Sequence, residues 1–283
     1  IVLMAAGTAA LYYAPEDNFW PLAILAMMGV QSALFSPAKY GILPEILRHD
    51  QLSKGNGLIE MLTMFAIIAG TALGPAMLAQ WEPWMTGAVL TGLAFVGFGA
   101  SLFVPKVQAA RGDGGLDSLS NAWESIRGER ILWLTVIGGA LYWSLASLVG
   151  QNMIVYSKNV LRLSDQFTGV PLAVLGLGIG IGAVIAGKMS AKKVEYGLIP
   201  FGAIGLGVGA LCFGISQTEV LWIALAFMAL MGVCGGILVV PLKTILQWYS
   251  PPERRGAIIA LDNVASFAGV LVGSVAGYFM AQA

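Results

Sequence analysis

The sequence predicts an all-α, polytopic membrane protein, on the evidence of its composition and of its long apolar runs. Its 283 residues are 58% hydrophobic and 11% charged, with a mean hydropathy of +0.81. A typical soluble domain is about 45–50% apolar and about 25% charged. The apolar runs lack the alternation over about ten residues that a membrane β-barrel requires. This composition also excludes a disordered chain, a coiled coil, a disulfide scaffold and a nucleic-acid-binding protein.

Eight apolar segments are long enough to cross a membrane, because a helical span needs about 20 mostly apolar residues. They cover residues 20–42, 57–78, 84–104, 131–149, 167–186, 196–215, 220–240 and 257–280. A ninth segment, 1–14, is apolar throughout but too short to cross. We interpret it as the end of a further span.

The basic residues predict the orientation of these spans. Of the 15 Lys and Arg residues, 13 lie in one set of alternate loops. The other two, Lys158 and Arg162, lie in the opposite set. Cytoplasmic loops carry an excess of Lys and Arg, so the first set is expected to face the cytoplasm.

A polar stretch, 105–130, separates a helical half at 1–104 from another at 131–283. It contains the Gly-rich sequence 111–115, which is typical of a flexible linker. An apolar stripe then follows at helical spacing, formed by Leu116, Leu119, Trp123 and Ile126. The stripe predicts a short amphipathic helix on the cytoplasmic membrane face, with a docking site for another protein as the alternative.

The two halves contain a weak internal repeat. One predicted span ends with Pro37-Ala38-Lys39 and another with Pro241-Leu242-Lys243, and the span after each opens near Asn56 or Asn263. The offsets are 204 and 207 residues. A parallel repeat of about 200 residues accommodates six spans, as in the two-halved plan of major facilitator transporters. On that plan the chain corresponds to about helices three to eleven of twelve.

Glycines recur at the spacing of close helix contacts, for example Gly232 and Gly236. The run Gly176-x-Gly178-x-Gly180-x-Gly182 lacks the spacing of a nucleotide-binding loop and lies within an apolar span. We therefore interpret it as a helix-packing surface.

Polar residues within or beside the spans are the candidate substrate-binding or gating residues, because ionisable groups in a membrane usually face a cavity or a partner. They are Gln31, Ser36, Lys39, Asn56, Glu60, Gln151, Asn152, Asp262 and Asn263. Lys39 and Glu60 are interpreted as functional, or alternatively as a structural latch beneath a cavity. Lys243 and Asp262 are interpreted as residues that reach the headgroups or form an ion pair. No hydrolytic constellation, metal site or cofactor is predicted, since the single His49 lacks an Asp at acyltransferase spacing.

Two segments carry a family resemblance. Residues 35–45 read FSPAKYGILPE and residues 52–75 read LSKGNGLIEMLTMFAIIAGTALGP. Together they resemble the lysophospholipid transporter family of the major facilitator superfamily. The sequence KKVEYGLIP at 192–200 is similar to the subgroup fused to an acyltransferase and an acyl-carrier-protein ligase. Matched by position, the family motif marks Ser36, Pro37, Lys39, Tyr40, Gly41, Glu45, Asn56, Gly57 and Glu60.

The resemblance implies a flippase that moves lysophospholipids, chiefly lysophosphatidylethanolamine, across the bacterial inner membrane for reacylation. We hypothesise transport by alternating access, with Pro37 bending its helix and Lys39 acting as a gate or phosphate contact. The chain departs from some family members in having no basic residue in the middle of span 131–149.

Two alternatives remain open. The chain could transport a soluble solute or drug with proton coupling through Glu60 or Asp262. It could also be a non-transporting membrane anchor for a fused acyltransferase.

Overall fold

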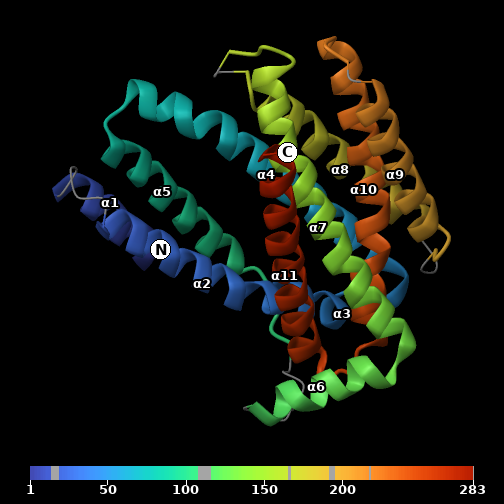
Figure 1. The fold of residues 1–283 in the computed structure, drawn as a ribbon. Helices are drawn as coiled ribbons and strands as arrows, with labels where there is room; N and C mark the ends of the chain where they lie inside the picture. The colour runs from blue at the N-terminus through green and yellow to red at the C-terminus, as the bar shows by residue number, and fades with distance from the viewer. Residues whose placement is uncertain (14–18, 108–115, 165–166, 191–194, 217, 283) are drawn as a thin grey trace. The chain divides into compact units, whose positions relative to one another are not determined.

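The computed structural model describes residues 1–13, 19–107, 116–164, 167–190, 195–216 and 218–282. Within these ranges the chain is helical and contains no strand. The predicted linker 111–115, Lys192 and Lys193 lie outside the described residues. The helices, which Figure 1 labels, are α1 Val2–Tyr13, α2 Phe19–Gly41, α3 Leu43–Ile46, α4 Leu52–Gln80, α5 Pro83–Ser101, α6 Leu116–Gly128, α7 Arg130–Asn159, α8 Val170–Met189, α9 Leu198–Ser216, α10 Leu221–Tyr249 and α11 Arg255–Gln282.

Eight helices in the described part of the chain are long and apolar enough to cross a membrane. They correspond one to one with the eight predicted spans, and α1 corresponds to the short ninth segment. The prediction of an all-α, multi-pass membrane protein is therefore confirmed.

Several helix ends differ from the prediction. The fourth predicted span ends at residue 149, but α7 continues to Asn159, so Gln151 and Asn152 lie inside the helix. The seventh predicted span ends at 240, but α10 continues to Tyr249 and includes Pro241. A minimal span of about 20 residues underestimates helices that extend beyond the hydrocarbon core.

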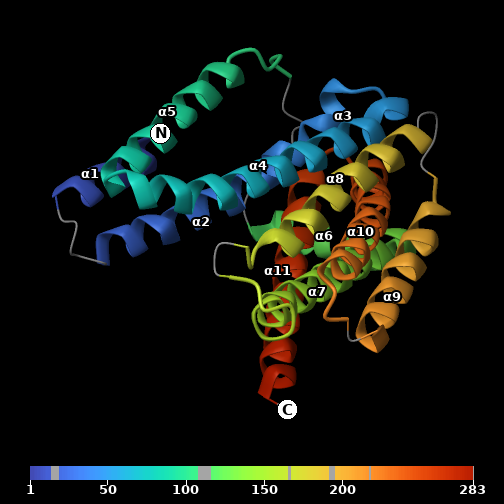
Figure 2. The same cartoon turned by 90° about the horizontal axis from the view of Figure 1, so that it is seen from above.

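The chain forms two compact units, and the helices α2 and α4 are each divided between them. The smaller unit comprises Ile1–Lys39 and Ala69–Ala109. In it α1 packs against α5, as both Figure 1 and Figure 2 show. The Thr8 and Thr91 hydroxyls lie 3.0 Å apart, and the Tyr12 and Trp84 rings meet edge to face with centroids 5.6 Å apart.

The larger unit comprises Tyr40–Ile68 and Ala110–Ala283. Its central contact joins α8 and α10, where glycines on both helices let the backbones approach closely. A Cβ atom added to Gly178 would lie 2.7 Å from the Ala229 carbonyl oxygen and 3.0 Å from the Gly232 Cα. Gly182 and Gly236 meet backbone atoms of the opposite helix at similarly short range. The interpretation of this glycine run as a helix-packing surface is confirmed.

A second close contact joins α7 and α11. Backbone atoms of Ala140 and Ser144 occupy the space where side chains at Gly269 and Gly273 would lie. The Ser147 and Ser274 hydroxyls lie 2.8 Å apart and form a hydrogen bond across the contact. Hydrogen bonds and small residues drive such contacts because apolar burial contributes little between helices in lipid.

Candidate functional site

A reciprocal pair of amide hydrogen bonds joins the start of α4 to α10 inside the larger unit. The Asn56 Nδ2 donates to the Gln247 Oε1 at 2.6 Å, and the Gln247 Nε2 donates to the Asn56 Oδ1 at 3.1 Å. The Gln247 Nε2 also donates to the Tyr40 carbonyl oxygen at 2.9 Å, and the Asn56 Nδ2 to the Thr244 hydroxyl at 3.2 Å. Asn56 and Gln247 are 2% and 1% exposed. Breaking this pair would leave the two buried amide oxygens without their donors, which costs about 1–3 kcal/mol for each group.

One helical turn before Gln247, Lys243 forms an ion pair with Asp262 of α11. The Lys243 Nζ lies 2.7 Å from the Asp262 Oδ2 and 5.5 Å from the centroid of the Tyr40 ring. The two charged side chains are only 13% and 3% exposed. On α7 the residue next to the Asp262 carboxylate is Gly139. A Cβ atom added to Gly139 would lie 3.3 Å from the Asp262 Oδ1. A small residue there leaves room for the carboxylate between the helices.

Glu60 is a further buried charged residue of this region. It is 6% exposed and lies one turn after Asn56 along α4. Its side chain lies near the phenol groups of Tyr40 and Tyr142. We call Tyr40, Asn56, Glu60, Lys243, Gln247 and Asp262 the polar cluster.

Glu45, which belongs to the sequence motif at 35–45, also contacts α11 outside the polar cluster. The Arg255 Nη1 of α11 lies 3.2 Å from the Glu45 Oε1 of α3, and both side chains are largely screened from solvent. The ring of His49, which precedes α4, lies against the Trp248 ring of α10 with centroids 4.5 Å apart. Residues 40–60 are therefore tied to α10 and α11 at several successive positions.

An apolar groove of about 510 Å³ lies between the first part of α4 and α8. Met61, Met64, Phe65 and Ile68 line it from α4, and Lys188 at the end of α8 is its charged residue. Next to the groove, α4 and α8 are in close contact, because Gly57 packs on the backbone of Ala183 and Gly187. Gly57 therefore acts as a packing residue that sets the distance between α4 and α8.

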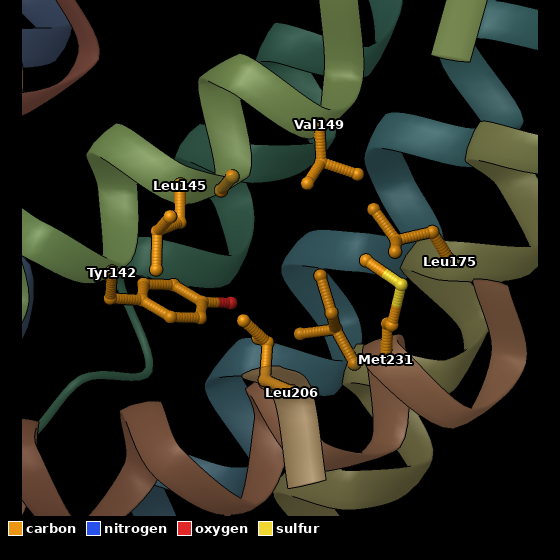
Figure 3. A pocket seen from close by; sticks show the side chains of 9 residues that line it. Tyr142, Leu145, Val149, Leu175, Leu206 and Met231 are labelled. Atoms are coloured by element: carbon orange, nitrogen blue, oxygen red, sulfur yellow. The ribbon is translucent and has the colours of Figure 1, made fainter. Parts of the chain in front are cut away.

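A smaller cavity of about 30 Å³ lies among α7, α8, α9 and α10. Figure 3 shows the Tyr142 hydroxyl pointing into it, opposite Leu175, Leu206 and Met231. The volume suits a water molecule or two, not an acyl chain.

The structure brings together four of the predicted site residues, namely Tyr40, Asn56, Glu60 and Asp262. Gln151 and Asn152 lie on α7 beside Gly277 of α11, away from the polar cluster. Asn263 follows Asp262 on α11 and is half-buried, whereas Gln31 is exposed on α2. Ser36, Pro37 and Lys39 belong to α2 in the smaller unit, and Gly41 ends that helix.

Four residues of the site were not predicted from the sequence, namely Gln247, Thr244, Tyr142 and Lys188. Gln247 lies in an otherwise apolar helix, four residues after Lys243, and both side chains therefore occupy one helix face. That polar spacing was a usable signal, but the predicted span ended before it.

Comparison with known proteins agrees with this architecture. The profile of the major facilitator superfamily matches residues 1–274. The chain is 31% identical over 255 residues to a protein of Photorhabdus laumondii named lysophospholipid transporter LplT, covering 87% of the chain and 61% of that relative. It is 32% identical over 271 residues to the protein of the same name from Citrobacter koseri, covering 90% of the chain and 65% of the relative. A protein of that name from Escherichia coli O1:K1 is 31% identical over 255 residues, with coverages of 87% and 63%.

The chain thus spans less than two thirds of the length of these relatives. The profile match covers nearly the whole chain, and the eight membrane-spanning helices of the described residues fit the same architecture. The chain is a multi-pass membrane protein that belongs to the major facilitator superfamily.

Proposed function

We propose that the chain is the transport region of a lysophospholipid flippase of the bacterial inner membrane. It moves lysophospholipids such as lysophosphatidylethanolamine to the cytoplasmic side, where an acyltransferase, fused or separate, reacylates them. The observation that carries the proposal is the similarity of about 31% identity, over 87–90% of the chain, to proteins named lysophospholipid transporters. The region itself performs no covalent step.

The larger unit offers separate surfaces for the two ends of such a lipid. An acyl chain fits the apolar groove between α4 and α8, whose volume of about 510 Å³ exceeds that of the cavity at Tyr142. The buried Glu60 carboxylate precedes the groove residue Met61 and suits the ammonium of an ethanolamine headgroup. A cation such as Lys188 suits the phosphate. A soluble sugar would not need an open apolar groove.

Transport would proceed by alternating access between helical halves 1–104 and 131–283, joined by the linker 105–130. In the described conformation residues 40–60 are bound to α10 and α11 through the polar cluster and through the ion pair of Glu45 with Arg255. We infer that these contacts close the cytoplasmic end and must break when that end opens. Pro37 and Pro241, each within a helix, are the positions where the backbone bends most readily.

The remaining predicted residues are proposed to line the headgroup path. They are Gln31, Ser36, Gln151, Asn152 and Asn263. Lys39 is proposed as the gate or phosphate contact, because its ammonium is a compact partner for an anion.

The role of Lys39 can be tested with Lys39→Ala in the intact protein, with Lys106→Ala as the control because Lys106 is an exposed loop residue. We expect Lys39→Ala to abolish uptake of lysophosphatidylethanolamine into spheroplasts at unchanged expression, and Lys106→Ala to retain it. Normal uptake by Lys39→Ala would overturn the role of Lys39. Competition by soluble solutes and a dependence on a pH gradient would overturn the proposed substrate class.

A further inference from the structure

Helix α6 is fixed by one of its faces against other helices of the larger unit. Ala122 and Ile126 are fully buried and pack with Leu132 of α7 and with Ile258 and Ile259 of α11. Figure 1 shows α6 running crosswise at the ends of α7 and α11. The orientation of its other faces is therefore set by the fold.

A second face of α6 presents Leu119, Trp123 and Arg127, which are spaced by four residues and form one stripe. Leu119 and Trp123 are 40% and 41% exposed. The Arg127 guanidinium carbon lies 5.2 Å from the centroid of the Trp123 ring, in cation–π geometry. The stripe thus combines an apolar side chain, an indole and a cation. We call these three residues the α6 stripe.

The height of the α6 stripe relative to the membrane follows from its contact with α7. The Trp123 and Trp133 rings meet edge to face, with centroids 5.8 Å apart and planes at 78°. Trp133 lies in the first turn of α7, a membrane-spanning helix. The Trp123 ring therefore lies at the level where α7 enters the bilayer, the depth at which tryptophan is enriched in membrane proteins. The loop that carries α6 belongs to the set with most of the basic residues, which is expected to face the cytoplasm.

The third face of α6 carries charge of the opposite sign. Glu124 follows Trp123 and is therefore rotated by about 100° around the helix. It is exposed. The Arg254 Nη1 donates to the Ser125 hydroxyl at 3.1 Å, which adds a polar tie between α6 and the residues before α11. The helix thus presents a cation within the α6 stripe and an anion, Glu124, on a different face.

We propose that the α6 stripe binds the cytoplasmic leaflet at the headgroups of anionic phospholipids. Leu119 and Trp123 enter the interface, and the Arg127 guanidinium binds a lipid phosphate as a forked donor. The occupant is a lipid surface and not a protein, because the stripe adjoins the entry point of a span and its charge is opposite to that of the leaflet. This role is independent of which substrate the protein transports.

The depth of α6 can be measured with a fluorescent label on the intact protein in nanodiscs that contain phosphatidylglycerol. Cys212 is exposed and is first replaced by Ser, whereas Cys234 is buried and stays. The label is placed by Leu119→Cys, or by Glu124→Cys as the matched control on the acidic face. We expect brominated lipid to quench the label at 119 and aqueous iodide to quench the label at 124. Equal quenching of both labels by iodide would overturn the proposal.

The lipid charge preference is tested with Arg127→Gln, with Glu124→Gln as the control on the same helix. Phosphatidylglycerol is titrated into the purified protein and its stabilising effect on thermal unfolding is measured, with phosphatidylcholine as the reference. A basic residue near an anionic surface contributes to the free energy of lipid binding. Loss of this contribution in Arg127→Gln should weaken the apparent affinity for phosphatidylglycerol about fivefold. Glu124→Gln should leave it unchanged. Equal titrations for the wild type and Arg127→Gln, or no response to phosphatidylglycerol, would overturn the proposal.

Discussion

Substitution of Gly178 by alanine tests whether α8 and α10 are in contact through their backbones. The added Cβ would lie 2.7 Å from the Ala229 carbonyl oxygen and 3.0 Å from both the Gly232 Cα and the Val233 nitrogen. Ordinary contacts at Cβ begin at 3.4 Å. All three neighbours are backbone atoms, so no side chain can rotate away and the helices themselves must separate.

The expected cost follows from two opposing contributions. Overpacking of a close contact costs about 1–3 kcal/mol, whereas replacing a helical glycine by alanine gains about 1 kcal/mol of helix propensity. Gly207→Ala in α9 is the matched control, because a Cβ there has no atom within 4 Å. The propensity gain is common to both variants, so the difference between them isolates the overpacking cost of about 1–3 kcal/mol.

The assay is unfolding of the purified protein in mixed micelles as the fraction of sodium dodecyl sulfate is raised, followed by circular dichroism at 222 nm. Gly178→Ala should unfold at a lower detergent fraction than the wild type, and Gly207→Ala at the same or a higher one. Coincident transitions for the two variants would refute the close backbone contact of α8 with α10.

Three further predictions concern the polar contacts of the larger unit. Lys243→Met should destabilise the protein by about 3–5 kcal/mol, because it leaves the Asp262 carboxylate buried without its cation. Adding Asp262→Leu should recover most of that loss in the same unfolding assay, and additive losses would contradict a coupled pair. Gln247→Leu should cost about 1–3 kcal/mol because the buried Asn56 Oδ1 loses its donor, whereas Gln80→Leu at an exposed position should have little effect; equal effects would argue against the amide pair. The hydrogen bond between the Tyr196 and Tyr249 hydroxyls, 2.9 Å apart, together with partial burial raises the pKa of Tyr196 from 10.0 to about 12. The stability from this bond is therefore complete below pH 10 and lost as the pH rises through about 12. Absorbance at 295 nm should show a tyrosine that titrates near pH 12 and that Tyr249→Phe shifts back toward 10, and an unchanged titration would contradict the bond.

The features of the fold that depend on local sequence were predictable. The length of an apolar run determines whether a helix can span the membrane, and the eight runs correspond to the eight helices of the described chain. The spacing of Gly178 and Gly182 along one helix likewise indicated a packing surface. Helix ends were less predictable: Lys243 looked like the start of a loop, yet it lies inside α10 with its charge neutralised by Asp262 of α11.

The candidate site was only partly predictable for the same reason. Asn56 and Glu60 were predicted as site residues because they are polar residues in an apolar segment. The partner of Asn56, Gln247, is 191 residues away in the sequence, and the pairing depends on how α4 meets α10. Periodicity within a single helix carries no information on such a long-range contact, whereas the fold places the two amides within hydrogen-bonding distance.

Transport of lysophospholipids can be measured after reconstitution of the intact protein into liposomes. Movement of labelled lysophosphatidylethanolamine between leaflets is followed with a membrane-impermeant quencher, in the presence and absence of soluble sugars and of a pH gradient. We expect protein-dependent movement of the lysolipid, and we expect that soluble sugars do not compete with it. No lysolipid movement, together with accumulation of a soluble solute driven by the pH gradient, would contradict the proposed function.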